Sequence, residues 1–323
     1  MLRRSILAAG ASILLATAAS AQSYPDRTIT MIVPFAAGGP TDTVARLIAE
    51  PMTAQLGQQV IVENVGGAGG TLGAARVAKA DADGYTLLLH HIGQATSASL
   101  YRKLPYKPGE AFAGVGLVTD VPMTLVARND FPPASIGDLI AYWKEHGDEV
   151  TLANAGVGSA SHLCGMLLMD ALDVSLTTVP YKGTGPAMTD LLGGQVDMMC
   201  DQTTNTVPQI ESGKIKGYAV TTPERLPVLP SLPTLDESGL KGFDMTVWHG
   251  MYAPAGTPKE ILDKLSGALQ VALADPKVIE RFAQLGTVPV AAEEATPAAL
   301  DQHLAAEIER WKPIIQAAGV YAD

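Results

Sequence analysis

The fold is indicated by the stretch Ile32-Val33-Pro34-Phe35-Ala36-Ala37-Gly38-Gly39-Pro40-Thr41-Asp42, in which a buried strand gives way to a loop of small residues and then to a helix. About 120 residues later the pattern returns in Leu152-Ala153-Asn154-Ala155-Gly156-Val157-Gly158-Ser159-Ala160-Ser161-His162. At this separation the two loops are expected to belong to different domains. The start of a helix exposes free backbone N–H groups at the positive end of its dipole, where an anion is favoured. Two such helix starts that face each other would clamp a small carboxylate.

The first 21 residues have the pattern of a cleavable secretory signal peptide. A basic start, Met1-Leu2-Arg3-Arg4, precedes a mostly apolar stretch over 6–18, and Ala19-Ser20-Ala21 fits a cleavage site before Gln22. The apolar stretch is too short and too rich in alanine for a membrane anchor. We therefore predict residues 1–21 as the signal peptide and the periplasm as the location of the mature protein.

The composition suits two domains of moderate size. Hydrophobic residues make up 47% of the chain and aromatic residues only 5%, so the cores are expected to be aliphatic. The formal net charge of −11 argues against nucleic acid as a partner, because nucleic-acid binding requires a basic surface. A local positive site can still operate within such a protein, because salt screens charges beyond about 8 Å.

Only two cysteines, Cys164 and Cys200, are present. In an oxidising compartment such a pair is a candidate disulfide, and two buried free thiols are the alternative. Neither a CxxC motif nor a spaced histidine cluster accompanies them, so we predict no metal site and no cofactor.

Strands and helices alternate twice along the chain, which predicts an α/β protein of two lobes, each with a mostly parallel sheet flanked by helices. An extended run over 115–127 and the segment Thr222–Pro233, which holds four prolines, are predicted to be the two crossings between the lobes. Lobe 1 is then expected to comprise residues 22–120 plus 226–323, and lobe 2 residues 121–225. Ligands of open parallel sheets bind at the carboxyl ends of the strands, so the two loops should line one cleft. The expected strands are 29–35, 60–65, 85–90, 150–154, 177–181, 196–200, 216–221 and 245–253, and the expected helices 41–56, 71–80, 161–172, 186–192, 207–211, 258–273, 276–285 and 297–317.

Nine short motifs follow one another along the chain: Tyr24-Pro25-Asp26-Arg27, 33–42, Gly66–Gly70, Asp83–Leu87, Tyr101–Tyr106, Gly158–Leu163, Val179–Gly183, Leu191–Asp197 and Ala253–Pro258. In this order they resemble the Bug-type periplasmic solute receptors of tripartite tricarboxylate transporters over essentially the whole mature chain. This resemblance implies a type II periplasmic-binding fold, a cleft for a small organic carboxylate, and delivery of that ligand to the small and large subunits of a membrane permease. We expect a monomer that closes on its ligand.

In such receptors backbone N–H groups and ordered water hold the ligand carboxylate, and neither principal loop here contains Arg or Lys. Ser161 could cap its helix, donate to the ligand or do both, and Asp42 could cap its own helix or contact the ligand. Asp201 could hold the hinge or orient a polar group of the ligand. The candidate ligand-binding residues are Phe35, Ala36, Gly38, Gly39, Asp42, His90, His91, Thr96, Gly158, Ser159, Ser161, Tyr181 and Asp201.

The paired histidines His90 and His91 follow the third strand, where many relatives carry small residues. Adjacent strand residues point to opposite faces, so one histidine is expected to face the cleft while the other packs. A protonated histidine there would add an anion contact below about pH 6.5. We therefore predict that His91→Ala alters the choice of ligand.

Three functions remain open at this stage. A transport receptor is the leading hypothesis, and a receptor that presents its ligand to a membrane sensor kinase would use the same cleft. A serine hydrolase is disfavoured because the chain lacks a GxSxG elbow and because Ser159, Ser161 and His162 are neighbours on one helix.

Gly66–Gly70 lacks the signature of a phosphate loop and is expected to form a close-approach turn beside the cleft. Tricarboxylates, C4 dicarboxylates, acidic amino acids and aromatic acids all remain candidate ligands.

Overall fold

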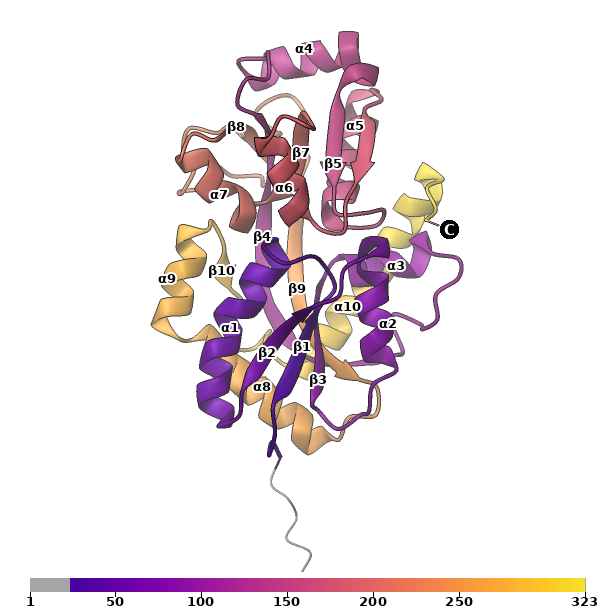
Figure 1. Ribbon diagram of the computed structural model, residues 1–323. Helices are drawn as coiled ribbons and strands as arrows, with labels where there is room; N and C mark the ends of the chain where they lie inside the picture. Colours follow the sequence, from indigo (N-terminus) through magenta and orange to yellow (C-terminus); the bar gives the residue numbers. More distant parts are fainter. Residues whose placement is uncertain (1–23, 323) are drawn as a thin grey trace, which may run out of the picture.

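Two lobes are joined by a pair of long strands, β4 (Phe112–Arg128) and β9 (Thr246–Pro254), in the computed structural model, which describes residues 24–322 (Figure 1). The two strands pair in antiparallel fashion from Phe112 opposite Pro254 to Pro122 opposite Thr246. The predicted signal peptide lies outside the described residues. The predicted crossing over 115–127 is confirmed, since β4 takes part in the sheets of both lobes.

The sheet of lobe 1 is parallel at one side and antiparallel at the other. Strand β1 (Ile29–Val33) pairs in parallel with both β2 (Val60–Asn64) and β3 (Thr86–His91), and β9 then joins β3 in the antiparallel direction. The short β10 (Val288–Pro289) pairs with β4. The helices of this lobe are α1 (Pro40–Leu56), α2 (Thr71–Ala78), α3 (Gly93–Leu100), α8 (Lys259–Leu273), α9 (Pro276–Gln284) and α10 (Pro297–Ala318), with the 3₁₀ turn η1 (Ala68–Gly70) before α2.

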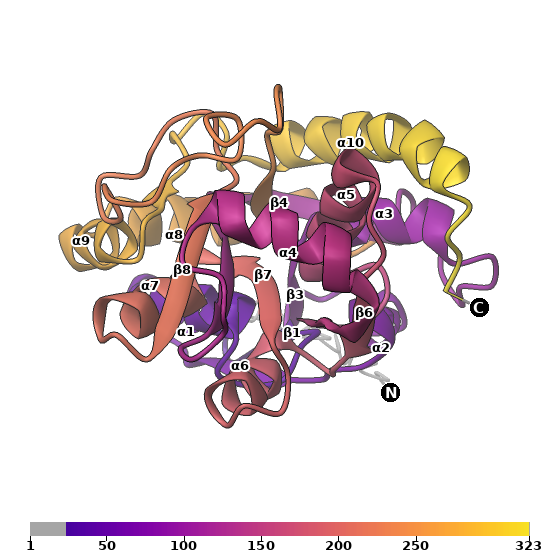
Figure 2. The same ribbon diagram turned by 90° about the horizontal axis from the view of Figure 1, so that it is seen from above.

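Both faces of this sheet are buried, which explains the continuous apolar runs of its strands. On β3, Leu87 and Leu89 belong to a core that includes side chains of α1 and α8. Leu88, between them, belongs to a second core with side chains of α2, α3 and α10. Seen from above, α10 lies on the opposite side of the molecule from α6 (Thr184–Leu192) of lobe 2 (Figure 2).

Lobe 2 repeats the scheme on a smaller scale. Strands β5 (Thr151–Asn154), β6 (Thr177–Pro180) and β7 (Met198–Gln202) are parallel, and β7 pairs in antiparallel fashion with β4. Strand β8 (Ile215–Val220) also pairs with β4. The helices are α4 (Ile136–His146), α5 (Ala160–Leu172), α6 (Thr184–Leu192) and α7 (Thr203–Glu211), with the 3₁₀ turn η2 (Gly147–Glu149) after α4. The predicted alternation of strands and helices is thus confirmed in both lobes, and long antiparallel strands complete each parallel set.

The proline-rich segment Thr222–Pro233 is not the return crossing. Its end stays at the sheet of lobe 2, because Val220 N–H donates to Pro233 O and Leu235 N–H donates to Val220 O. The chain enters the sheet of lobe 1 only at β9, after Met245. Four prolines produce turns that fold back on β8 instead of an extended connection. We therefore propose that the boundary of lobe 2 lies near residue 245 in place of residue 225.

Two helices form where the sequence offered no prediction. Helix α3 is made of Gly, Gln, Ala, Thr, Ser and Leu. Helix α4 follows the N-cap residue Ser135, whose side chain accepts from Asp138 N–H in a capping box. In α3 the small polar residues are buried together with the apolar ones, so no amphipathic pattern marks the helix.

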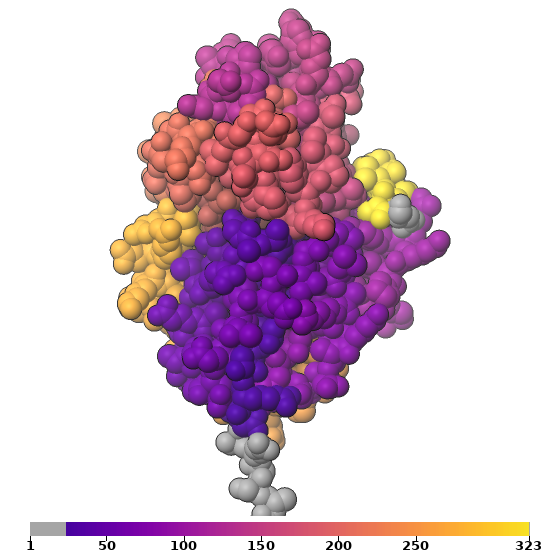
Figure 3. All heavy atoms as spheres, in the orientation of Figure 1, coloured from indigo at the N-terminus to yellow at the C-terminus, as the bar shows by residue number. Residues whose placement is uncertain are grey.

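The two lobes are in contact along the face that Figure 3 shows. Ala36 N–H of lobe 1 donates to Lys182 O of lobe 2 at 3.0 Å. The Thr96 hydroxyl donates to Gly158 O at 3.3 Å, and the Tyr101 hydroxyl lies 2.8 Å from Val157 O. A Cβ on Gly66 would lie 2.7 Å from Lys182 O, which confirms that the glycine-rich loop is a close-approach turn. The structure therefore describes the closed arrangement of the lobes.

The predicted disulfide is present inside lobe 2. Cys164 on α5 is bonded to Cys200 on β7, with their Cα atoms 6.1 Å apart and both side chains buried. It attaches the helix that follows the second small-residue loop to the central strand of this lobe. Among residues 24–322, none of the helices combines the length and the apolar character needed to cross a bilayer.

Candidate functional site

Four helices begin around one enclosed space between the lobes. α1 reaches it from lobe 1, and α5, α6 and α7 reach it from lobe 2. In this closed arrangement the cavity among the lining residues is about 10 Å³. Its lining consists of Phe35, Gly39, Pro40, Thr41, His91, Ala155, Ala160, Ser161, Thr184, Asp201 and Gln202.

Three of these helices start without a side-chain cap. The N-cap residues Gly39 of α1, Gly183 of α6 and Gln202 of α7 make no capping hydrogen bond from their side chains. The first-turn N–H groups of a helix have no partner inside the helix, so they are available to a ligand. None of the described residues that line the space is Arg or Lys. The positive potential here therefore comes from backbone dipoles, which favour a carboxylate.

The start of α5 is organised by two serines. Ser159 is the N-cap residue, and its Oγ accepts from His162 N–H at 3.3 Å. Ser161 Oγ accepts from Ala155 N–H at 2.8 Å and lies 3.1 Å from Ser159 Oγ. If Ser159 donates its proton to Ser161, the Ser161 hydroxyl is free to donate into the space. Ser159 thus caps the helix, and Ser161 both braces the loop and lines the space.

A cluster of histidines forms the wall of lobe 1. His91 lines the space and stacks on Phe35 with ring centroids 4.6 Å apart, whereas His90 packs beside both rings. His91 Nδ1 accepts from Gly93 N–H at 3.0 Å, so the neutral ring carries its proton on Nε2. Burial, and then the neighbouring His90 and His249, hold the pKa of His91 well below its usual range. The expected anion contact through protonation near pH 6.5 is therefore wrong, and His91 offers a neutral N–H donor instead.

His249 on β9 packs against His91, with ring centroids 5.8 Å apart, and supports this wall without lining the space. The sequence did not single it out. Its Nδ1 lies 3.1 Å from Val247 O, and a carbonyl can only accept, so Nδ1 carries the proton. Burial lowers the pKa of His249 to about 4, which keeps the ring neutral. The unprotonated Nε2 then accepts from the Thr41 hydroxyl at 3.2 Å. Because that hydroxyl is committed, Thr41 can offer only its backbone N–H to an anion.

Asp201 is the acidic group of this lining, and it is 1% exposed. Asn205 Nδ2 donates to its Oδ2 at 2.6 Å. Burial raises the pKa of the Asp201 carboxyl to about 6, against the opposing effect of hydrogen bonds from Asn205, Gln202 N–H and Thr184. A carboxyl group with this pKa can be present in either protonation state near neutral pH.

Several predicted site residues support the space without lining it. Asp42 accepts from Gly38 N–H at 3.0 Å, from Asn64 Nδ2 at 2.9 Å and from Arg46, so its carboxylate braces the loop. Tyr181 turns its hydroxyl to Asp190 at 2.7 Å. His90 packs behind Phe35, while Ala36, Thr96 and Gly158 take part in the hydrogen bonds between the lobes. Of the thirteen candidates, the structure brings Phe35, Gly39, His91, Ser161 and Asp201 to the space itself.

The lining residues that the sequence analysis missed are neighbours of those it chose. Pro40 and Thr41 follow Gly39, and Ala155 and Ala160 lie within the second loop. Thr184 and Gln202 stand where β6 and β7 lead into helices, a position typical of ligand contacts in parallel sheets. The same rule selected Asp201, directly before Gln202, and Tyr181, three residues before Thr184, so in each case it stopped short of the residue that lines the space.

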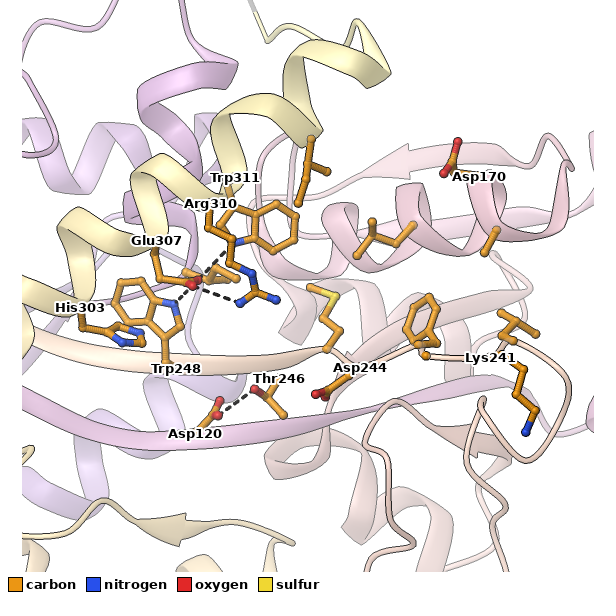
Figure 4. A pocket seen from close by; sticks show the side chains of 18 of the residues that line it. Asp120, Asp170, Lys241, Asp244, Thr246, Trp248, His303, Glu307, Arg310 and Trp311 are labelled. Atoms are coloured by element: carbon orange, nitrogen blue, oxygen red, sulfur yellow. Dashed lines mark hydrogen bonds and ion pairs between the residues drawn. The ribbon is translucent and has the colours of Figure 1, made fainter.

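A larger hollow lies elsewhere, between α10, α5 and the segment 239–246 (Figure 4). Glu307 Oε2 there accepts from Trp248 Nε1 at 3.0 Å and from Trp311 Nε1 at 3.1 Å, while its Oε1 accepts from Arg310 at 3.0 Å. The remaining charges in the lining are three aspartates and one lysine. Since this lining is acidic, the hollow disfavours an anion, and the space between the lobes is the better candidate for a carboxylate.

The chain is similar to proteins of one family. Residues 44–320 match the family described as "Tripartite tricarboxylate transporter family receptor". The protein from the TAR-I ttuE-ttuC' intergenic region of Agrobacterium vitis is 59% identical over 309 residues, covering 96% of this chain and 89% of that protein.

Two solved structures are also similar. The periplasmic binding protein BugD is 56% identical with a TM-score of 0.90, over 92% of this chain and 99% of that one. MatC from Rhodopseudomonas palustris with bound malate is 45% identical with a TM-score of 0.87, over 90% of this chain and 100% of that one. The expected α/β fold of periplasmic binding proteins is thereby confirmed.

Proposed function

Because the chain belongs to the tripartite tricarboxylate transporter family of receptors, which bind solutes and catalyse no reaction, we propose that it captures a small organic carboxylate between its lobes. It then delivers this ligand to the small and large membrane subunits of a tripartite permease. Export to the periplasm by the predicted signal peptide, and a monomeric state, belong to the same proposal.

The observation that carries the proposal is the convergence of four helix starts on a space whose lining has neither Arg nor Lys among the described residues. Each hydrogen bond to a charged group contributes on the order of 1.5–3 kcal/mol. Three or four such bonds would support micromolar binding, about −8 kcal/mol, after the costs of association. Backbone donors therefore suffice to bind a carboxylate.

The ligand class is proposed from a relative and not from the size of the space. In this closed arrangement the cavity is about 10 Å³, room for about one water molecule, so its volume does not select among acids. MatC, a similar protein, was solved with malate. We therefore propose a C4 dicarboxylate as the ligand class, ahead of tricarboxylates and aromatic acids.

Titration calorimetry of the purified mature protein with L-malate, succinate, L-aspartate, citrate and terephthalate tests the proposal. We expect micromolar binding of at least one C4 acid, with weaker or undetectable binding of terephthalate. In a thermal scan, that acid at 100 times its dissociation constant should stabilise the protein by about 2.7 kcal/mol. Absence of heat with every acid, or conversion of the ligand during the titration, would contradict the proposal.

His91 gives a sharper prediction within this site. His91→Ala removes the Nε2–H donor and is expected to weaken binding of the preferred acid by about tenfold or more, because a hydrogen bond to a carboxylate is lost. His91→Gln retains an N–H donor and should recover part of the affinity. The loss should be equal at pH 6 and pH 8, since the ring is neutral at both.

The control for His91 is His146→Ala, on an exposed part of α4. This variant should bind like the parent protein. Calorimetry across the acid panel measures all three variants, and unchanged affinities and unchanged selectivity in His91→Ala would exclude a role for His91 in recognition.

A further inference from the structure

Asp201 occupies an unexpected position for an acidic residue, at the carboxyl end of β7 in the lining of a space built for an anion. Its side chain is buried, so water does not screen its charge from a ligand in this space. Within the described lining, no Arg or Lys accompanies it. An ionised Asp201 would therefore face the ligand carboxylate without a neutralising partner.

The groups that surround Asp201 are uncharged. Its partners are Asn205 on α7, Thr184 on α6 and the backbone N–H of Gln202, and Thr124 on β4 donates to the backbone oxygen of Asp201. On the facing wall of lobe 1, burial keeps His91 and His249 neutral. On α1, Asp42 is paired with Arg46, so their charges offset each other.

A like charge disfavours the ionised form of a buried carboxyl group, whereas a protonated carboxyl can donate a hydrogen bond to a carboxylate. Burial already brings the pKa of Asp201 to about 6 in the unliganded protein. A bound anion raises this pKa further, because only the protonated form avoids the repulsion. The two protonation states therefore bind an acid with different affinities.

Resting on the proposed function, we propose that Asp201 takes up one proton from solvent when the ligand enters, and that its O–H then donates a hydrogen bond to the ligand carboxylate. Binding is accordingly linked to pH. Below about pH 6 Asp201 is protonated before binding, so the affinity is constant. Above that pH the free protein must gain a proton, and the affinity falls by up to about tenfold per pH unit.

Calorimetry in two buffers of different ionisation enthalpy counts the protons taken up on binding. The probe is whichever of L-malate, succinate, L-aspartate and citrate binds most tightly. At pH 7 we expect an uptake close to one proton, and about a tenfold loss of affinity between pH 7 and pH 8. This measurement requires no variant, so it does not depend on whether a substituted protein folds.

The variant Asp201→Asn tests whether the proton taken up on binding goes to Asp201. The amide retains an acceptor for Asn205 and an N–H donor for the ligand. We expect no proton uptake, a flat affinity from pH 6 to pH 8, and tighter binding than the parent protein at pH 8. Asp190→Asn, at the hydroxyl of Tyr181 and outside the lining, is the control and should show the proton uptake of the parent.

The possible outcomes separate the two proposals. Tight binding without proton uptake means that Asp201 stays ionised, for example to accept from a hydroxyl or ammonium group of the ligand, and overturns this inference while the proposed function stands. Proton uptake that persists in Asp201→Asn also overturns it. If none of the four acids binds the parent protein, the proposed function itself fails.

Discussion

Replacing Gly185 by alanine is expected to weaken ligand binding by about 5- to 150-fold without loss of stability in the unliganded protein. Gly185 lies in the first turn of α6, on the side of lobe 2 that faces lobe 1. A Cβ at this position would lie 2.6 Å from Ala37 O, 3.1 Å from Gly38 C and 3.2 Å from Gly39 N. All three atoms belong to the backbone of the opposite lobe. The added methyl group therefore obstructs closure of the lobes.

The magnitude follows from the cost of overpacking. Extra methyl groups in close-packed contacts cost about 1–3 kcal/mol, and each 1.4 kcal/mol is a factor of ten in affinity. Within lobe 2 the substitution is favourable, because alanine stabilises a helix by up to about 1 kcal/mol relative to glycine. The effects on binding and on stability are thus expected to have opposite signs.

Calorimetry with the preferred acid and urea unfolding without it measure these two effects. Gly267→Ala is the matched control, since Gly267 lies inside α8 and a Cβ there would meet no atom within 4 Å. Small-angle scattering should show that saturating ligand compacts the control and compacts Gly185→Ala less. Parent-like affinity in Gly185→Ala would mean that the ligand binds without the closure that the structure describes.

Removal of the disulfide is expected to lower the free energy of unfolding by about 2–4 kcal/mol. Cys164 and Cys200 are 36 residues apart, so their bond closes a loop of that length in the unfolded chain. The chain-entropy estimate for such a loop is about 3–4 kcal/mol. The bond is buried in the core of lobe 2, so its loss also leaves a small unfilled volume.

The double variant Cys164→Ala/Cys200→Ala tests this prediction by urea unfolding. Unfolding the parent protein with and without dithiothreitol supplies the control, because reduction breaks the same bond and keeps both sulfur atoms. The reduced parent should approach the double variant in its unfolding midpoint. A double variant as stable as the oxidised parent would show that the closed loop contributes nothing to the stability of lobe 2.

The fold was largely predictable because its cause is local. The apolar runs of β1 and β3 and the helical spacing in α1 and α10 are properties of short windows, so the elements emerged within a few residues of their observed bounds. Helix α3 was not predicted because most of its buried side chains are small or polar. The return crossing was placed wrongly at Thr222–Pro233 because turns that pack on β8 have the composition of a linker.

The site was predictable only in part. Gly39, Ser161 and Asp201 follow strands, and a strand end in a parallel sheet can be recognised from sequence. His249 could not be recognised in this way, because it lies within a strand and not at its end. Its hydrogen-bond partner Thr41 is 208 residues away in the chain. The neutrality of the histidines likewise depends on burial by residues from distant segments.

The sequence by itself determined the two-lobed α/β class, the family, the candidate disulfide pair and the two helix starts with neither Arg nor Lys in their loops, because each is a property of residues near one another in the chain. Tertiary structure alone decided which groups share the space between the lobes, that His91 is a neutral donor, and that Asp201 is buried in a lining whose described residues include neither Arg nor Lys. Desolvation causes this difference: a side chain's charge state and its access to a ligand depend on everything packed around it, and that packing is assembled from both halves of the chain.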